Sequence, residues 1–305
     1  MFAFIVRRLL IAIPVMFIVV SLTFLLVRLM PGSPFDLERS QDKEAVRRME
    51  VRYELDGPLW WQYARYIGAV ARGDLRESIS QYRDMPVTEI LKQTLPVSLL
   101  LGSIAYALSV SVGVLLGAVA AVHHNQWQDR AAMFLAIGGI SLPVFLLAPL
   151  LILLSLITNL LPPAGWGDFD QLILPSICLA VPYAASVARL TRASFLEVLG
   201  HDYVRTARAK GLSENVVVYK HALKVAILPV ISYCGPLAAS ILTGSLVVET
   251  IFKIPGMGPF FVNSVLSLDV FMVGGTVIVF AALLILFNIV VDVLYFVIDR
   301  RIKLD

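Results

Sequence analysis

Long apolar runs limit the possible folds of this chain more than any other feature. The first run extends without interruption from Leu9 to Val27, between Arg8 and Arg28. A helix needs about 20 such residues to cross the hydrocarbon core of a bilayer. Five further apolar segments follow, at residues 95–122, 131–158, 172–188, 225–248 and 273–298. With 58% hydrophobic residues and a mean hydropathy of +0.82, the sequence predicts an all-α polytopic membrane protein with six transmembrane helices.

A polar stretch after the first run divides the chain into three parts. Residues 1–30 form the first transmembrane helix. We expect this helix to be uncleaved, because its apolar run is longer than the core of a signal peptide and no small-x-small cleavage site follows it. Residues 31–94 are rich in charged side chains and form a soluble insertion, and residues 95–305 carry the remaining five helices.

Basic residues in the connections indicate the orientation, because Lys and Arg are retained on the cytoplasmic side of a membrane. The connection at 189–224 carries seven of them, whereas 159–171 carries none and 250–272 carries only Lys253. Both ends of the chain are also basic. We therefore expect both termini and the 189–224 loop in the cytoplasm, and the 31–94 insertion on the outside.

Within the cytoplasmic loop, residues 202–211 predict a short basic helix. Asp202 is a residue type that caps the amino end of a helix by accepting free backbone N–H groups. Gly211 can adopt the left-handed conformation that ends such a helix. The predicted helix is therefore bounded on both sides by residues of the loop itself.

The predicted helix has two different faces. Arg205 and Arg208 are three residues apart and share one face, while Val204 and Ala207 share another face that is small enough for a partner to grip. A basic loop that is only solvated beside anionic lipid headgroups is the alternative interpretation.

The sequence lacks the motifs of common catalytic sites. It has no G-x-x-x-x-G-K-[ST] loop to cradle ATP, and no G-x-S-x-G or H-E-x-x-H motif of a hydrolase. Its four histidines lie in cytoplasmic connections without metal-ligand spacing, and Cys178 and Cys234 lie inside apolar runs. A net charge of +3 does not favour a nucleic-acid partner. We expect a non-catalytic protein with no metal and no cofactor of its own.

Asn288 and Asp292 place polar groups one helical turn apart inside the last apolar run. Carboxylates within a membrane are expensive and usually functional, so this pair could form a proton path. It could equally be a hydrogen-bonding pair that packs against a neighbouring helix. The structural interpretation is favoured, since Asp292 is the one clearly central acid of the chain.

Motifs along nearly the whole chain resemble those of ABC importer permeases of the peptide and nickel subfamily, above all the first membrane subunit of oligopeptide permeases. The generic signature of their cytoplasmic loop is Glu-Ala-Ala, three residues, then Gly. Aligned on Gly211, this chain has Arg205-Thr206-Ala207 at the triplet, so it keeps Ala207 and Gly211. The other matching segments are Arg7–Leu10, Arg28–Phe35, Gly73–Leu75, His221–Lys224, Leu228–Pro229, Gly244–Thr250, Pro255–Gly258 and Val291–Tyr295.

This resemblance implies a type I ABC importer permease fold and a division of labour between subunits. A second homologous permease subunit would complete the path, and two cytoplasmic ATPase subunits would bind ATP and magnesium. An extracytoplasmic peptide-binding protein would deliver cargo to the bacterial inner membrane, where lipid also contacts the chain. The loop helix would couple to an ATPase. The coupling residues implied are Asp202, Tyr203, Arg205, Ala207, Arg208, Ala209, Lys210 and Gly211.

The same resemblance implies an outer gate near Glu249, Pro255, Gly256 and Gly258, where glycine would permit a tight turn. A dipeptide or nickel permease is the nearest alternative. Alternatives from other classes are a proton-coupled secondary transporter that uses Asp292 as its carrier, and a membrane scaffold that transports nothing.

Overall fold

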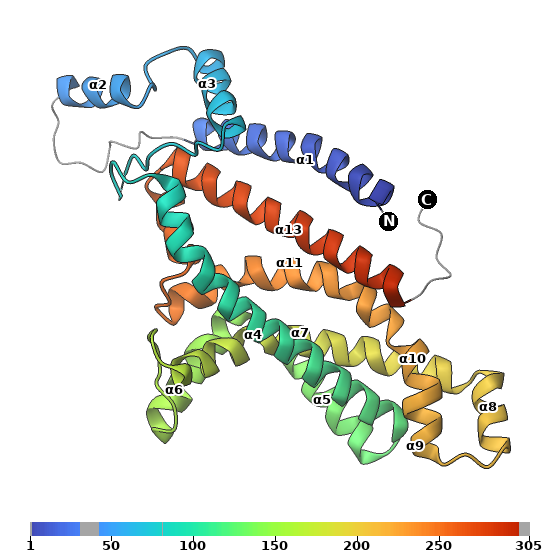
Figure 1. Ribbon diagram of the computed structural model, residues 1–305. Coiled ribbons are helices and arrows are strands. Elements are labelled where there is room, and N and C mark those ends of the chain that lie inside the picture. The colour runs from blue at the N-terminus through green and yellow to red at the C-terminus, as the bar shows by residue number, and fades with distance from the viewer. Residues whose placement is uncertain (1, 31–42, 81, 299–305) are drawn as a thin grey trace. The chain divides into compact units, whose positions relative to one another are not determined.

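The computed structural model describes residues 2–30, 43–80 and 82–298. Its order of helices along the chain is drawn in Figure 1. The helices are α1 (Phe2–Leu29), α2 (Lys43–Arg52), α3 (Leu59–Ala71), α4 (Val87–Val122), α5 (Trp127–Ser141), α6 (Val144–Thr158), α7 (Phe169–Leu199), α8 (Asp202–Ala209), α9 (Glu214–Val216), the π-helix η1 (Val217–Ala222), α10 (Leu223–Ala226), α11 (Leu228–Ile251), α12 (Met257–Leu266) and α13 (Val270–Ile298).

In the part of the chain that the structure describes, four helices are long and apolar enough to cross a membrane: α1, α4, α7 and α13. Two bent helix pairs raise the number to six when each pair is counted as one span. In one pair, α5 and α6 meet at 109°, and in the other the 214–226 helices meet α11 at 49°. The expected six spans are thus present, but the third and fifth are not single straight helices.

Proline explains where these two bends occur. Pro143 directly precedes α6, and Pro229 is in the first turn of α11. Proline lacks the backbone N–H that would continue the preceding helix. Pro175 and Pro182, by contrast, lie inside α7, which continues through both.

The chain folds as two compact units, which are described separately. The first contains residues 1–98 and 255–285, and the second contains residues 99–254 and 286–305. The predicted boundary between the insertion and the rest of the chain, after residue 94, therefore falls near the first unit's edge. Residues 255–285, which include α12 and the start of α13, belong to the first unit.

The first unit has an aromatic core. Tyr66 of α3 stacks on Phe24 of α1, with ring centroids 5.4 Å apart, and on Phe271 of α13, at 6.2 Å. Gly274 makes room for this ring, because a Cβ atom there would lie 2.2 Å from the Tyr66 hydroxyl oxygen. The core thus joins two ends of the sequence that lie about 250 residues apart.

A buried carboxylate fixes the connection between α3 and α4 to the amino end of α13. Asp269 accepts hydrogen bonds from the Ser78 hydroxyl at 2.5 Å and from the backbone N–H of Ile79 at 3.0 Å. Its other oxygen accepts the backbone N–H of Met272 at 3.0 Å, which makes Asp269 the N-cap of α13. Every one of these contacts lies within the first unit.

The second unit is built around α7, whose most apolar stretch is 61% buried. Gly113 and Gly117 let α4 approach α7 closely, because a Cβ at Gly117 would lie 2.4 Å from the Ala188 carbonyl oxygen. Gly139 of α5 faces Val181 of α7 in the same way, whereas a Cβ at Gly138 would meet nothing within 4 Å. Three of these four glycines thus lie at close helix contacts, as small residues often do between membrane helices.

Candidate functional site

The segment expected to couple to an ATPase forms α8, and its carboxyl end has the predicted geometry. Gly211 has φ +74, and its N–H donates to the Arg208 carbonyl at 2.9 Å. The next N–H, of Leu212, donates to the Ala207 carbonyl at 3.4 Å. These two bonds make the Schellman arrangement, in which a left-handed glycine satisfies the last carbonyls of a helix.

The predicted cap at the other end is wrong. Asp202 is the first residue of α8, and the N-cap position belongs to His201, which has extended backbone angles and makes no side-chain cap hydrogen bond. The Asp202 carboxylate is 98% exposed and lies 3.7 Å from Arg205. It still favours the helix through its negative charge in the first turn.

The small-residue face of α8 points into the chain. Val204 is fully buried and Ala207 is 5% exposed, and both pack in an apolar cluster with Phe195 of α7 and Val217 of η1. The expectation that this face is gripped by a partner is therefore corrected. It is occupied by the second unit's own core, and Ala207 can act only by seating the helix.

The outward face of α8 is basic and accessible. The exposed residues of α8 are Asp202, Tyr203, Arg205, Thr206, Arg208 and Ala209, and Lys210 and Gly211 directly after it are also exposed. The Arg205 side chain is 72% exposed, and the ion pair with Asp202 is at the surface, where it holds the guanidinium weakly. Partial desolvation of its hydroxyl raises the pKa of Tyr203.

Arg208 is engaged within the loop. Its Nε lies 3.1 Å and its Nη2 lies 2.6 Å from the two carboxylate oxygens of Glu214. This bidentate pair raises the pKa of Arg208, chiefly through the hydrogen bonds to Glu214. It ties α8 to α9 across the Gly211 turn, so Arg208 shapes the loop and Arg205 is the more available of the two arginines.

Two features of this region escaped sequence analysis. The first is η1, a six-residue π-helix between α9 and α10. The π-helix is rare and often marks a functional position. No sequence signal predicts it, because residues 217–222 have an ordinary helical composition. It lies between α8 and the bend into α11, as Figure 1 shows from the order of α8, α9, α10 and α11.

The second is a buried ion pair near the same end of α7. Asp129 at the start of α5 is 3% exposed, and its carboxylate oxygens lie 2.6 and 2.8 Å from Nε and Nη2 of Arg192. The Asn125 N–H also donates to Asp129, at 2.9 Å. The sequence marks Asp129 as an acid in the first turn of a helix, but it does not identify Arg192, 63 residues away, as its partner.

The residues expected at the outer gate lie in different surroundings. Glu249 of α11 is fully buried, and its backbone carbonyl accepts the Ile254 N–H at 2.8 Å. Pro255 is exposed, while Gly256 and Gly258 are buried. Gly256 has φ −89, which lies outside the left-handed region. That conformation occurs instead at Lys253, with φ 56.

The described residues contain no group of three or more His, Cys, Asp or Glu side chains that could hold a metal. Cys178 is buried and Cys234 is half-buried, and both are free thiols. The side chain of Asp292 lies outside the described part of the structure, so the proposed proton path stays a prediction.

Comparison with known proteins places the whole chain. Residues 113–304 match the family described as binding-protein-dependent transport system inner membrane component, and residues 1–101 match its N-terminal counterpart. The chain is 44% identical over 306 residues to the oligopeptide transport system permease protein OppB of Escherichia coli K12, covering 99% of this chain and all of that protein. It is 42% identical to OppB of Haemophilus influenzae, with the same coverage. It is also 44% identical over 288 residues to the dipeptide transport system permease protein DppB of Bacillus subtilis, covering 94% and 93% of the two chains.

The fold is shared with a solved transporter. A chain of the MetNI methionine ABC transporter in inward-facing conformations superposes with a TM-score of 0.57 at 16% identity, covering 70% of this chain and 98% of that one. This likeness concerns the fold alone. Together with the two family matches, it establishes that the chain belongs to the family of binding-protein-dependent transport system inner membrane components.

Proposed function

We propose that this chain is the membrane subunit of an ATP-driven importer of peptides, and that α8 is the surface through which an ATPase acts on it. Its relatives carry the names of oligopeptide and dipeptide permeases and match it almost from end to end. Such a subunit is a non-catalytic permease, and ATP hydrolysis belongs to a separate subunit. The relatives include both peptide classes, so the proposed cargo is peptide, with oligopeptides first.

The proposed assembly has four kinds of partner. A second homologous permease completes the path, two cytoplasmic ATPase subunits bind ATP and magnesium, an extracytoplasmic peptide-binding protein delivers cargo, and lipid surrounds the spans. The chain itself holds no cofactor. In the proposed topology both termini lie in the cytoplasm, because basic connections are retained on that side of the membrane.

The observation that carries the coupling proposal is the contrast between the two faces of α8. Arg205 and Lys210 are exposed, while Val204 and Ala207 are buried against α7 and η1. A force on the outer face is therefore transmitted to the spans through close packing, because packed interiors are poorly compressible. Movement of α8 would reach α11 through η1 and the 49° bend.

The outer residues complete this proposal. Glu249 and the turn of Pro255, Gly256 and Gly258 would form the gate at the opposite ends of the spans. Glu249 is fully buried in α11, and carboxylates within a membrane are usually functional, which supports this role.

The test of coupling is a charge reversal on the outer face. Arg205→Glu, in the complete transporter reconstituted in proteoliposomes, should lower ATP-driven peptide uptake by about tenfold or more, because it places like charge against acids of the ATPase. Arg48→Glu is the matched control. Arg48 is 77% exposed in α2 and takes no part in the coupling loop.

Both variants should insert and assemble at wild-type levels, since neither side chain is buried. Normal uptake by Arg205→Glu would remove the coupling role from this face of α8. Uptake that persists without ATP would exclude the proposed energy source altogether.

A further inference from the structure

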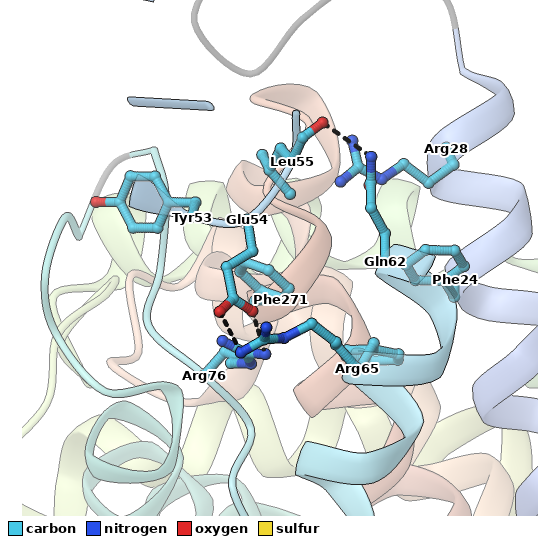
Figure 2. A pocket seen from close by; sticks show the side chains of 10 residues that line it. Phe24, Arg28, Tyr53, Glu54, Leu55, Gln62, Arg65, Arg76 and Phe271 are labelled. Atoms are coloured by element: carbon cyan, nitrogen blue, oxygen red, sulfur yellow. Dashed lines mark hydrogen bonds and ion pairs between the residues drawn. The ribbon is translucent and has the colours of Figure 1, made fainter. Parts of the chain in front are cut away.

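The first unit contains two neighbouring cavities that the coupling proposal does not use. The inner one, of about 10 Å³, is lined by side chains of α1, α3, the connections around Glu54 and Arg76, and α13 (Figure 2). The outer one, of about 270 Å³, shares Tyr53, Arg76 and Phe271 with it. A space of about 10 Å³ holds one water-sized atom, whereas the outer cavity holds a small molecule.

The inner cavity is cationic. Arg28, Arg65 and Arg76 line it, against the single carboxylate of Glu54. Glu54 is already shared, because its two oxygens lie 2.5 Å from Arg65 and 2.7 Å from Arg76. Figure 2 shows this three-residue contact, and it shows the Arg28 side chain extending from α1 toward Gln62. Arg28 contacts the Phe24 ring at 5.9 Å and makes no salt bridge among the described residues; Glu50 acts on its charge only through space.

The polar atoms left without a partner in this cavity are mostly donors. Among the described residues, Nε and Nη2 of Arg28, Nε of Arg76 and the Tyr66 hydroxyl have no hydrogen-bond partner. The one unpaired acceptor is Oε1 of Gln62, whose amide nitrogen donates to two backbone carbonyls. Burial raises the pKa of Tyr66 to about 12, so its hydroxyl remains a donor at neutral pH. Buried donors without a partner, such as these, need a ligand that accepts hydrogen bonds.

The chemistry of the ligand follows from these donors. An ionised carboxylate only accepts hydrogen bonds, and its negative charge would balance that of the arginines. Its two oxygens also match the two-pronged guanidinium group. One carboxylate oxygen fits the inner cavity, while the remainder of the molecule occupies the outer one. The outer cavity is lined by Arg52 and Arg76 as well as by the exposed acids Asp74 and Glu77. The two arginines lie 2.7 Å from Asp84 and Glu54 respectively, so Asp74 and Glu77 supply the negative charge that suits a cationic group on the same ligand.

We propose that the first unit binds a zwitterion of the amino-acid or short-peptide class, with its carboxylate at Arg28 and Tyr66 and its ammonium group near Asp74 and Glu77. This site is separate from α8. The proposal rests on the proposed function only in that a peptide is chosen as the probe ligand.

Isothermal titration calorimetry of the full chain in phosphatidylcholine nanodiscs tests the site without ATP or partner subunits. Dialanine should bind, and dialanine amide should bind at least about tenfold more weakly, because it lacks the ionised carboxylate. Arg28→Met should weaken dialanine by at least about tenfold, whereas Arg48→Gln, a matched loss of one exposed positive charge, should leave it unchanged.

The ammonium end has its own test. Glu77→Gln should weaken dialanine several-fold but should leave N-acetyl-dialanine, which has no ammonium group, unchanged. Arg28→Met should weaken both peptides. The thermal midpoint of the Arg28→Met variant should not fall below that of wild type, because the change removes a half-buried cation that has no salt bridge among the described residues. Arg28→Lys, which keeps the charge but loses the fork, should also weaken binding.

Equal binding of dialanine and its amide, or normal binding by both Arg28 variants, would overturn the proposal. Equal binding of acetate and dialanine would overturn the peptide assignment, because it would leave only a general anion site. A transporter that fails to couple through α8 would leave all of these results unchanged, so the two proposals fail separately.

Discussion

Gly211 ends α8 with φ +74, a conformation that residues with a side chain adopt at a cost of about 1 kcal/mol. Space is not the constraint, because a Cβ at this position would meet nothing within 4 Å. The glycine is needed for backbone geometry, and through the Schellman bonds it sets the direction in which the chain leaves α8. The same is true of Gly73, which has φ +79 and is equally uncrowded after α3.

These two glycines give a matched pair of variants. Gly211→Ala and Gly73→Ala should each lower the free energy of unfolding by about 1 kcal/mol, because the strain is the same. Gly211→Ala alone should reduce ATP-driven uptake several-fold, since only that turn positions the coupling face. Denaturant titration and proteoliposome uptake would measure the two effects. A similar loss of uptake in both variants would show that stability, and not coupling, is what transport senses.

Asp129 and Arg192 hold the start of α5 against the end of α7. The Asp129 side chain is 5% exposed and that of Arg192 is 24% exposed, so loss of one partner leaves a partly buried charge. Asp129→Asn should therefore lower the free energy of unfolding by about 2–3 kcal/mol, somewhat less than for a fully buried pair. Replacing both residues by leucine should cost less than the sum of the single changes. Unfolding by dodecyl sulfate, followed by circular dichroism, measures this, and a loss below about 0.5 kcal/mol would mean that water solvates Arg192 freely.

At the scale of helices, close contact between α4 and α7 depends on the absence of side chains. A Cβ at Gly117 would lie 2.4 Å from the Ala188 carbonyl oxygen and 2.6 Å from the Thr191 Cβ, so neither neighbour is a flexible side-chain end. Helices in a membrane associate chiefly through such packing, because lipid tails are as apolar as the side chains.

Gly117→Ala should lower the thermal midpoint of the purified chain by several degrees, since α4 must move away from α7. Gly138→Ala is its control, because the added methyl group would meet nothing within 4 Å and alanine favours a helix. Differential scanning fluorimetry of both variants would detect the difference. A Gly117→Ala midpoint equal to that of Gly138→Ala would mean that the two helices separate without loss.

Apolar length predicted the spans, but the presence of proline does not by itself show which of them bend. Proline lies inside α1, α4, α6, α7 and α11 as well as directly before α6, and only Pro143 and Pro229 coincide with the two bends. The prolines of α7 lie in a helix packed on several sides, and the sequence does not show which neighbours will compensate for a missing N–H. Asp269 could have been predicted as a cap, because it stands directly before the last apolar run.

The candidate sites divide in the same way. The turn at Gly211 depends on local chemistry and was predicted, whereas the inward direction of Ala207 depends on Phe195 and Val217 and was not. The cavities of the first unit bring together Arg28, Gln62, Arg76 and Phe271. Residues so far apart in the sequence are joined only by tertiary packing, which no spacing rule encodes.

At the scale of the whole molecule, each unit has its own apolar core and its own charged surface. The first unit joins residues 1–98 to residues 255–285, and α4 and α13 each continue from one unit into the other. The two proposed sites belong to different units, and the predicted orientation puts α8 in the cytoplasm and the 31–94 insertion outside.

That orientation can be tested with single cysteines in a chain that carries Cys178→Ala and Cys234→Ser. Arg48→Cys and Arg205→Cys place thiols at side chains that are 77% and 72% exposed, so both positions are reachable once a reagent is on the correct side. A membrane-impermeant maleimide should label position 48 in cells whose outer membrane is permeabilised. It should label position 205 only after the inner membrane is permeabilised as well. This pattern is expected because the seven basic residues of the 189–224 connection are retained in the cytoplasm, while the insertion is long enough to be translocated despite its charge. The reverse pattern would put α8 on the side that lacks ATP and would exclude the coupling proposal. Labelling of both positions from outside would contradict the membrane topology itself.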